Sequence, residues 1–110
     1  MLIEIKKAGA VTVAVVSGDI DSKTAPQAQA QLLTVIESTG RLVMDMSGVG
    51  FMSSAGLRMM LLMYRQATSK EGKIALVGLS DEIKDTMSMT GFLNFFVVAD
   101  TLDEGLKAIG

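Results

Sequence analysis

The chain has 110 residues, of which 49% are apolar, and its 10 basic and 12 acidic side chains give a net charge of −2. A chain of this size can bury a core without metals or disulfides, and its charge gives no reason to expect nucleic acid. Histidine and cysteine are both absent, which excludes Ser-His-Asp triads, thiol chemistry and histidine zinc sites. We therefore predict a single domain over residues 1–110 that is not an enzyme and uses no cofactor.

The N-terminus and the apolar stretches indicate a compartment. An acid, Glu4, follows the first three residues, so no signal peptide is apparent. Asp45 and Arg58 interrupt the best candidate for a membrane span. The lack of cysteine fits a reducing environment, and we predict a cytoplasmic protein.

The first predicted elements are two strands, over 2–6 and 11–16. The first alternates apolar and polar residues and the second is β-branched, with Ala8-Gly9-Ala10 between them, which predicts an antiparallel hairpin. Ala14 and Val16 leave open which face of the second strand is buried. The candidates for the core side are Ile3, Ile5, Val11, Val13 and Val15.

A helix is predicted over 25–37, with Thr24 as N-cap and Pro26 in the first turn, and Gly40 closes it. Its apolar residues recur at helical spacing, so one face packs inward. That face consists of Ala25, Ala28, Leu32, Val35 and Ile36.

Strands and helices then alternate. We predict strands over 41–45, 73–78 and 95–98, and helices over 54–68, after Ser80, and after the capping box at Thr101–Glu104. The inner faces of the last two helices are Ile83, Met87 and Met89, then Leu102, Leu106 and Ile109. The order β-β-α-β-α-β-α-β-α implies an α/β fold: a mostly parallel sheet with an N-terminal antiparallel hairpin and about four helices.

The stretch 42–64 contains the candidate site. A buried strand is followed by a glycine-containing turn and a helix whose first turn carries Ser53 and Ser54. Serine at a helix start can cap the free backbone N–H groups. The same groups and the helix dipole also accommodate an anion, so a serine here could carry a phosphate without melting the helix.

Three motifs of this chain carry a resemblance to a known family. Gly18-Asp19-Ile20-Asp21 with Thr24-Ala25 fits a G-x-[LI]-D turn before the first helix. The pattern D-x-S…V-x-F-[IM]-D-S-[ST/A]-G-L is matched in most places by Asp45-Met46-Ser47, Val49 and Phe51-Met52-Ser53-Ser54-Ala55-Gly56-Leu57. Met87-Ser88-Met89-Thr90-Gly91-Phe92 is similar to an L/M-x-[LM]-[ST]-G-[LF] helix end. In this order, over nearly the whole chain, the motifs resemble those of the STAS domain and, within it, of the small bacterial anti-sigma factor antagonists.

The resemblance implies a protein-interaction switch. The family's phosphorylated serine aligns with Ser54, with Ser53 as second choice. The unphosphorylated form would bind an anti-sigma factor that is also a serine kinase with a histidine-kinase-like ATP fold, and so release a sigma factor. Phosphorylation would break the complex, and a metal-dependent serine phosphatase would restore it. The implied partner-facing residues are Asp19, Asp21, Thr24, Ser53, Ser54, Gly56 and Arg58, with Asp45 and Ser47 supporting the loop.

One position departs from the family. The aspartate that precedes the target serine in the family is replaced by Ser53 in this chain. Three alternatives follow: Ser54 is phosphorylated with altered efficiency, Ser53 is the acceptor instead, or the protein is the substrate of a different kinase. Asp19 and Asp21 either face the partner or only initiate the turn. The helix 57–64 has Arg58 as its single charge, so its methionines are either buried gap-fillers or an adaptable contact surface.

Two other functions remain as alternatives. STAS domains also serve as accessory subunits of membrane transporters. A hydrolase using Ser53 or Ser54 is disfavoured because the chain has no histidine base and Met52 stands where a nucleophile elbow needs glycine.

Overall fold

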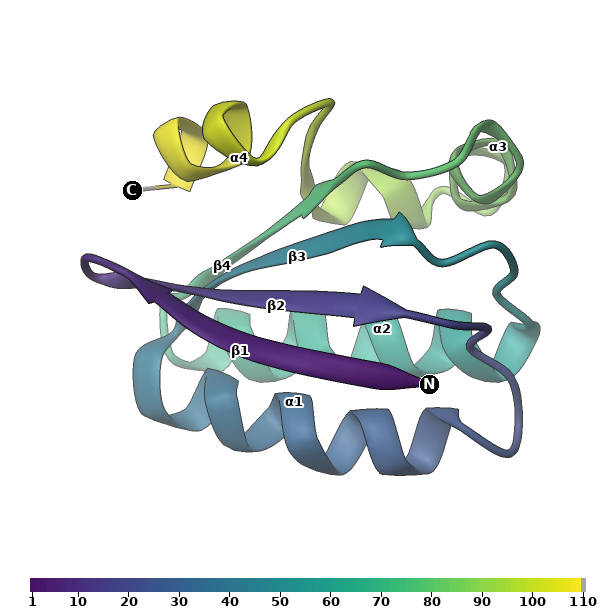
Figure 1. Cartoon of the computed structure of the whole chain (residues 1–110), viewed down its shortest axis with the longest axis horizontal. Helices are drawn as coiled ribbons and strands as arrows, with labels where there is room; N and C mark the ends of the chain where they lie inside the picture. The colour runs from purple at the N-terminus through teal and green to yellow at the C-terminus, as the bar shows by residue number, and fades with distance from the viewer. Residues whose placement is uncertain (110) are drawn as a thin grey trace.

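A computed structural model describes residues 1–109 and shows a five-stranded sheet covered by helices on both faces (Figure 1). Gly110, the last residue of the predicted domain, lies outside the described residues. The strands are β1 (Leu2–Ala8), β2 (Val11–Ser17), β3 (Arg41–Gly48), β4 (Lys73–Val77) and β5 (Val97–Ala99). The helices are α1 (Ala25–Thr39), α2 (Ser54–Ser69), α3 (Asp81–Met89), a 3-10 helix η1 (Phe92–Phe95) and α4 (Leu102–Ile109).

The strand order is β1-β2-β3-β4-β5, with β1 antiparallel to β2 and all other neighbours parallel. The predicted fold class, with its N-terminal hairpin and strand–helix alternation, is confirmed. The strand beginning at Arg41 is central, and it extends through Gly48. Because β2, β3 and β4 are parallel, the loops that follow them all lie at the same end of the sheet, where these strands terminate.

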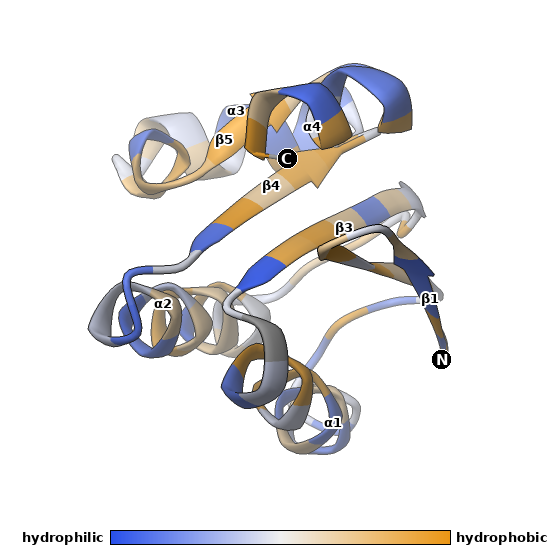
Figure 2. Cartoon of the chain, turned by 90° about the vertical axis from the view of Figure 1, so that its left-hand side faces the viewer, coloured by the Kyte–Doolittle hydropathy of each residue, from blue (hydrophilic) through white to orange (hydrophobic). Residues whose placement is uncertain are grey.

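Two apolar clusters lie on the two sides of the sheet. Helices α1 and α2 cover one face and α4 covers the other, with the apolar strands β3 and β4 between them (Figure 2). Leu42 and Met44 belong to the larger cluster, under α1 and α2, whereas Val43 faces α4. This double burial explains why the first half of β3 contains the continuous apolar run Leu42-Val43-Met44, which is typical of parallel sheets.

The face of β2 that the sequence left open is also explained by double burial. Ala14 and Val16 pack towards α1 and α2, while Val11 and Val13 pack towards α4. Ile3 is only partly buried. The prediction for Ile5 is wrong: its side chain is 39% exposed, because β1 is the edge strand and α1 packs over β2 and β3.

The predicted helix starts and ends largely hold. Gly40 adopts a left-handed conformation (φ 70°) after α1, and its N–H donates to the Ile36 carbonyl. Thr24 is at the N-cap of α1 and Pro26 is in its first turn, but the Thr24 hydroxyl makes no cap bond. Ser80 caps α3, accepting from the Ile83 N–H at 3.2 Å.

The aromatic segment before the last strand differs from the prediction. Residues 92–95 form η1 and the strand begins only at Val97, because the rings turn towards α2: Tyr64 stacks on Phe95 with centroids 4.9 Å apart. Met89, predicted on the inner face of α3, is 87% exposed, whereas Ile83 and Met87 are buried.

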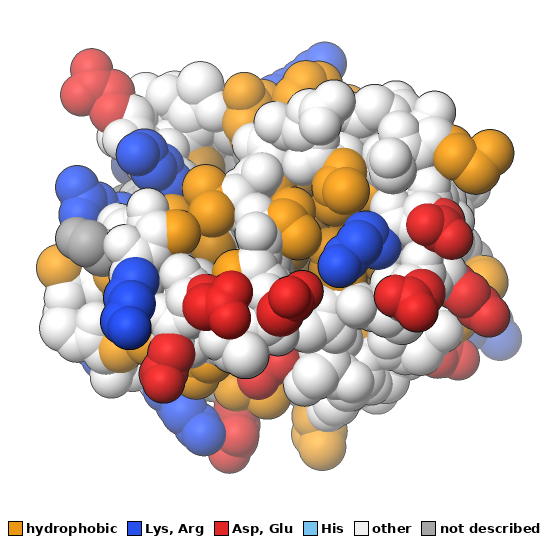
Figure 3. Space-filling model, turned by 90° about the horizontal axis from the view of Figure 1, so that it is seen from above, with side chains coloured by type: hydrophobic (Ala, Val, Ile, Leu, Met, Phe, Trp, Pro, Cys, Tyr) orange, Lys and Arg blue, Asp and Glu red, His pale blue; other side chains and the backbone are white. Residues whose placement is uncertain are grey.

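The structure also decides between the two interpretations of α2. Met59, Met60 and Met63 are all buried, since α2 packs against both α1 and the sheet, so the methionines fill the core and form no exposed methionine surface. None of the described helices has the length and hydropathy needed to cross a membrane. Over the face that carries α3 and α4, charges of both signs surround an apolar patch, with no continuous basic surface (Figure 3).

Candidate functional site

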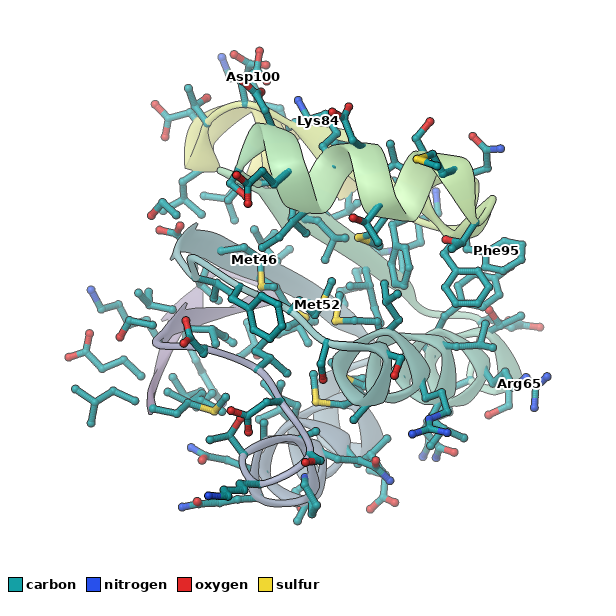
Figure 4. The ribbon with its side chains drawn as sticks, turned by 90° about the vertical axis from the view of Figure 1, so that its right-hand side faces the viewer. Met46, Met52, Arg65, Lys84, Phe95 and Asp100 are labelled. Atoms are coloured by element: carbon teal, nitrogen blue, oxygen red, sulfur yellow. The ribbon has the colours of Figure 1, made fainter. Side chains whose placement is uncertain are left out.

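The candidate site lies where the chain leaves β2 and β3, at the carboxyl ends of these strands, which face the viewer in Figure 4. Two loops, residues 18–24 and 49–53, run beside each other there. The Ile20 N–H donates to the Phe51 carbonyl (2.9 Å), and the Ser53 N–H donates to the Ile20 carbonyl (2.8 Å). This short parallel bridge holds the Asp19–Asp21 turn next to the start of α2.

The underside of the site is tightly packed. Ile20 and Met52 are buried, and Met52 points into the molecule beneath the loop (Figure 4). A Cβ added to Gly56 would come within 2.5 Å of Met52 Cγ and 2.9 Å of Ile20 Cγ2, so only glycine lets the first turn of α2 sit this close to the loops. Gly56 is itself buried and therefore supports the surface from below.

The two adjacent serines differ in environment. Ser54 is the first residue of α2 and is exposed, and within residues 1–109 its hydroxyl makes no hydrogen bond. Ser53 occupies the N-cap position, but its Oγ makes no cap bond and is buried without a partner among the described residues. One hydroxyl is accessible to another protein, and the other is enclosed.

The neighbouring turn is held rigid by its own side chains. Asp21 Oδ1 accepts hydrogen bonds from the backbone N–H groups of Lys23 (2.9 Å) and Thr24 (3.1 Å). The Thr24 hydroxyl donates to the Asp19 carbonyl (2.9 Å) and accepts from the Asp21 N–H (2.9 Å). The backbone N–H groups of Thr24 and then Lys23 hold the pKa of the Asp21 carboxyl below its ordinary value. Asp21 and Thr24 thus shape the turn, while Asp19 is exposed on the loop that hydrogen-bonds to Phe51 and Ser53.

Arg58 is exposed four residues after Ser54, so the two side chains lie on the same side of α2. Beside them a groove of about 350 Å³ runs between the first turns of α1 and α2. Its floor and walls are Ser22, Ala25, Pro26, Gln29, Ala55, Arg58, Met59 and Leu62. The groove extends the exposed surface around Ser54 towards α1.

Asp45 and Ser47 lie apart from the serines. Asp45 Oδ1 accepts from the Ser47 N–H (3.1 Å) and the Ser47 hydroxyl (2.7 Å). Both side chains point to the α4 side of β3, since Asp45 pairs with Val15 and Val77, and Ser47 abuts Gly78. Their hydrogen bonds fix the conformation at the end of β3. They can therefore support the loop 49–53 only indirectly, by fixing the strand from which it starts. Across residues 1–109 no group of three acidic side chains is placed to share a metal ion.

Sequence reasoning did not single out Phe51 as a site residue. Its ring is 53% exposed, between the buried Val49 and Met52. It borders a small hollow of about 120 Å³ that also involves Glu82 and Thr86 of α3. The available signal was an aromatic residue after the glycine-containing turn, two positions before the first of the two serines.

Comparison with known proteins places this chain in a family. The model of the STAS domain matches residues 3–105, so the chain belongs to the STAS domain family. It is 28% identical to BtrV of Bordetella bronchiseptica, provisionally named an anti-sigma factor antagonist, over 98% of this chain and 94% of BtrV.

Solved structures agree. An anti-sigma factor antagonist from Mycobacterium paratuberculosis superposes with a TM-score of 0.89 at 30% identity, covering 98% of this chain and 92% of that one. The anti-sigma factor antagonist SpoIIAA, in its unphosphorylated form, superposes at 0.81 with 18% identity, covering 98% and 96%. At that identity SpoIIAA supports the fold alone. The resemblance to the STAS-domain anti-sigma factor antagonists is confirmed.

Proposed function

We propose that this protein is an anti-sigma factor antagonist switched by phosphorylation of Ser54. In its unphosphorylated form it binds an anti-sigma factor that is also a serine kinase with a histidine-kinase-like ATP fold. Phosphorylation releases it, and a metal-dependent serine phosphatase restores binding. The exchange takes place in the cytoplasm and controls transcription. The observation that carries the proposal is the exposed hydroxyl of Ser54 at the start of α2, which makes no hydrogen bond among the described residues.

Accessibility favours Ser54 over Ser53 as the phosphate acceptor. A kinase must bring ATP in line with the acceptor oxygen, so that oxygen has to be reachable from solvent. Ser54 meets this requirement in the folded state, whereas Ser53 Oγ is buried. The loss of the family's aspartate at position 53 then leaves the site of modification unchanged and alters only what the kinase reads beside it.

The geometry also explains how a phosphate could act without a conformational change. A phosphoserine adds about −1.5 to −2 charges. At the first position of a 16-residue helix the charge meets the positive end of the helix dipole, so the fold tolerates it. Arg58, one turn along on the same side, can pair with it.

At an interface the same charge is costly. It must lose water, and it adds to the negative charge of Asp19 on the neighbouring loop. A penalty of about 3 kcal/mol lowers the affinity roughly a hundredfold. The docking surface comprises the exposed parts of the loop 18–24, the first two turns of α2 and the groove beside Arg58.

The test is phosphosite mapping with matched alanine variants. The parent protein, Ser54→Ala and Ser53→Ala are incubated with ATP and the serine kinase of this fold class from the same genome, and incorporation is measured by mass spectrometry. We expect phosphate on the parent and on Ser53→Ala, and none on Ser54→Ala. Full incorporation in Ser54→Ala would remove the proposed site. Recovery of a transporter ATPase subunit, and no such kinase, in a pull-down would instead support the transporter function.

A further inference from the structure

The edge strand β1 has features that the switch does not use. It is seven residues long, and among residues 1–109 it pairs with β2 alone, in a ladder without a bulge from Leu2↔Ser17 to Ala8↔Val11. Figures 1 and 2 show β1 at the outer margin of the sheet, with no other element beyond it. A regular edge presents a row of backbone N–H and C=O groups on which another strand can add.

The side chains of β1 combine exposed apolar residues with charges of both signs. Leu2 is 75% and Ile5 39% exposed, and the strand contains no proline. Glu4 and Lys6 point to the same face, where they form a loose ion pair at 3.9 Å with both side chains mostly in solvent. An exposed ion pair of this kind contributes little within one molecule.

The sequence of β1 is complementary to itself when reversed. Ile5 is the midpoint of Leu2–Ala8, so a two-fold axis through Ile5, perpendicular to the sheet, would pair the strand with a second copy over its whole length. Glu4 of each copy would then lie opposite Lys6 of the other. Ile5 would pack against its own counterpart, Leu2 opposite Ala8, and Ile3 opposite Lys7.

Charge selects this register over its neighbours. Shifting the axis to Glu4 places two carboxylates opposite each other, and shifting it to Lys6 places two ammonium groups opposite each other. An axis between residues would pair side chains from opposite faces of the two sheets. The Ile5-centred register is therefore the full-length antiparallel pairing in which unlike charges meet.

We propose that β1 is a self-association edge, on which a second copy of this chain pairs antiparallel about Ile5 and joins the two five-stranded sheets into one. Four charges, Glu4 and Lys6 from each copy, then alternate in sign across the junction. The lysines disfavour strands that bring no matching acid, so the edge is selective for itself. One strand is a small interface, and we expect a weak dimer with a dissociation constant on the order of 0.1 mM.

The test is a charge-exchange experiment on the whole chain. Sedimentation velocity and amide-shift dilution are recorded from roughly 10 µM to roughly 1 mM for the parent, Glu4→Lys, Lys6→Glu and Lys7→Glu. Each of the first two variants places two like-charge pairs across the junction, and we expect the dissociation constant to rise at least about tenfold. Lys7→Glu makes the same charge change as Lys6→Glu but faces Ile3, so it should leave dimerisation nearly unchanged.

Mixing provides the decisive arm. Glu4→Lys and Lys6→Glu should each dimerise only weakly alone. In an equimolar mixture both pairs between positions 4 and 6 are Lys opposite Glu, so a heterodimer should form with about the affinity of the parent. A parent that stays monomeric over the whole range overturns the proposal. So does a dimer that Glu4→Lys and Lys6→Glu leave intact, or a mixture that does not associate. The readout is independent of phosphorylation.

Discussion

Two helices of this protein, α2 and α3, begin in similar sequence contexts but differ in how their N-termini are capped. Both α2 and α3 follow a parallel strand, and both have a serine at the N-cap, Ser53 and Ser80. Helix α3 closes its own N-terminus: Ser80 Oγ accepts from the Ile83 N–H, and Asp81 and Glu82 supply negative charge in the first turn. Helix α2 has neither a side-chain cap nor an acid in its first turn.

The difference leaves the start of α2 open to an added anion, as the proposed switch requires. In α3 the positive end of the dipole is already neutralised by the chain itself. In α2 it is not, and the residue placed there is the exposed Ser54. The open end is held in position by packing from below, through Gly56, Met52 and Ile20, so that its surface needs no stabilising cap.

The largest effect on stability is expected from adding a side chain at Gly56, where the first turn of α2 packs against the loops. Gly56→Ala forces a methyl group into Met52 and Ile20, and should lower the free energy of unfolding by about 2 kcal/mol. Gly50→Ala is the matched control, because its Cβ would approach no closer than 3.9 Å to Asp19 Oδ1. Urea denaturation of both variants gives the comparison. An equal loss in the two would contradict the role assigned to Gly56.

The two N-cap serines should respond unequally to alanine. Ser80→Ala removes a cap bond and should cost about 1 kcal/mol of unfolding free energy. Ser53→Ala removes a buried hydroxyl without a partner in the described structure, and should be neutral or slightly stabilising. Thermal unfolding of the pair decides the matter. A larger cost at Ser53 than at Ser80 would mean that α2 is capped after all.

A negative charge at the start of α2 should stabilise the folded protein. Ser54→Asp places a carboxylate at the open end of the dipole and should raise the unfolding free energy by about 0.5 kcal/mol at low salt, with the gain shrinking as salt is added. Ser54→Asn is the neutral control of similar size. If the aspartate variant were less stable than the asparagine variant, the fold would not tolerate the proposed phosphate in the way described.

The smallest effect concerns the turn beside the site. The pKa of Asp21 is lowered in the folded state by hydrogen bonds from the backbone of Thr24 and Lys23. A lowered folded-state pKa stabilises the protein above the unfolded value of 3.8, and this contribution is lost as the pH falls through the folded-state value. Asp21→Asn should flatten this part of the acid-unfolding profile. An unchanged profile would show that the turn does not depend on the ionised carboxylate.

The fold could be predicted from the sequence because each element has its own period and its own end signals. Alternation and β-branching marked the hairpin, helical spacing marked α1, and Gly40, Ser80 and Gly91 marked helix boundaries. The errors fall where burial depends on which neighbour covers a face. Ile5 is apolar but lies on an edge strand, and Met89 lies outside the buried face of α3. Neither position in the fold could be predicted from the spacing of apolar residues.

The candidate site could be located but not resolved from the sequence. Serines at a helix start are predictable, yet which of two adjacent hydroxyls faces solvent depends on how the loop enters the helix, and the Ser53–Ile20 bridge decides this in favour of Ser54. The side of the sheet on which Asp45 and Ser47 lie follows from the strand register. Gly56 was part of the expected partner-facing set, and its burial was visible only once Ile20 was placed against it.

The most direct test of the switch is the affinity of the anti-sigma kinase for two forms of this protein, unmodified and phosphorylated at Ser54, measured by calorimetry with a non-hydrolysable ATP analogue present. The account predicts tight binding of the unmodified protein and a loss of about a hundredfold on phosphorylation, with the circular dichroism spectrum unchanged. Equal affinities for the two forms, or a lower affinity that accompanies partial unfolding of α2, would contradict it.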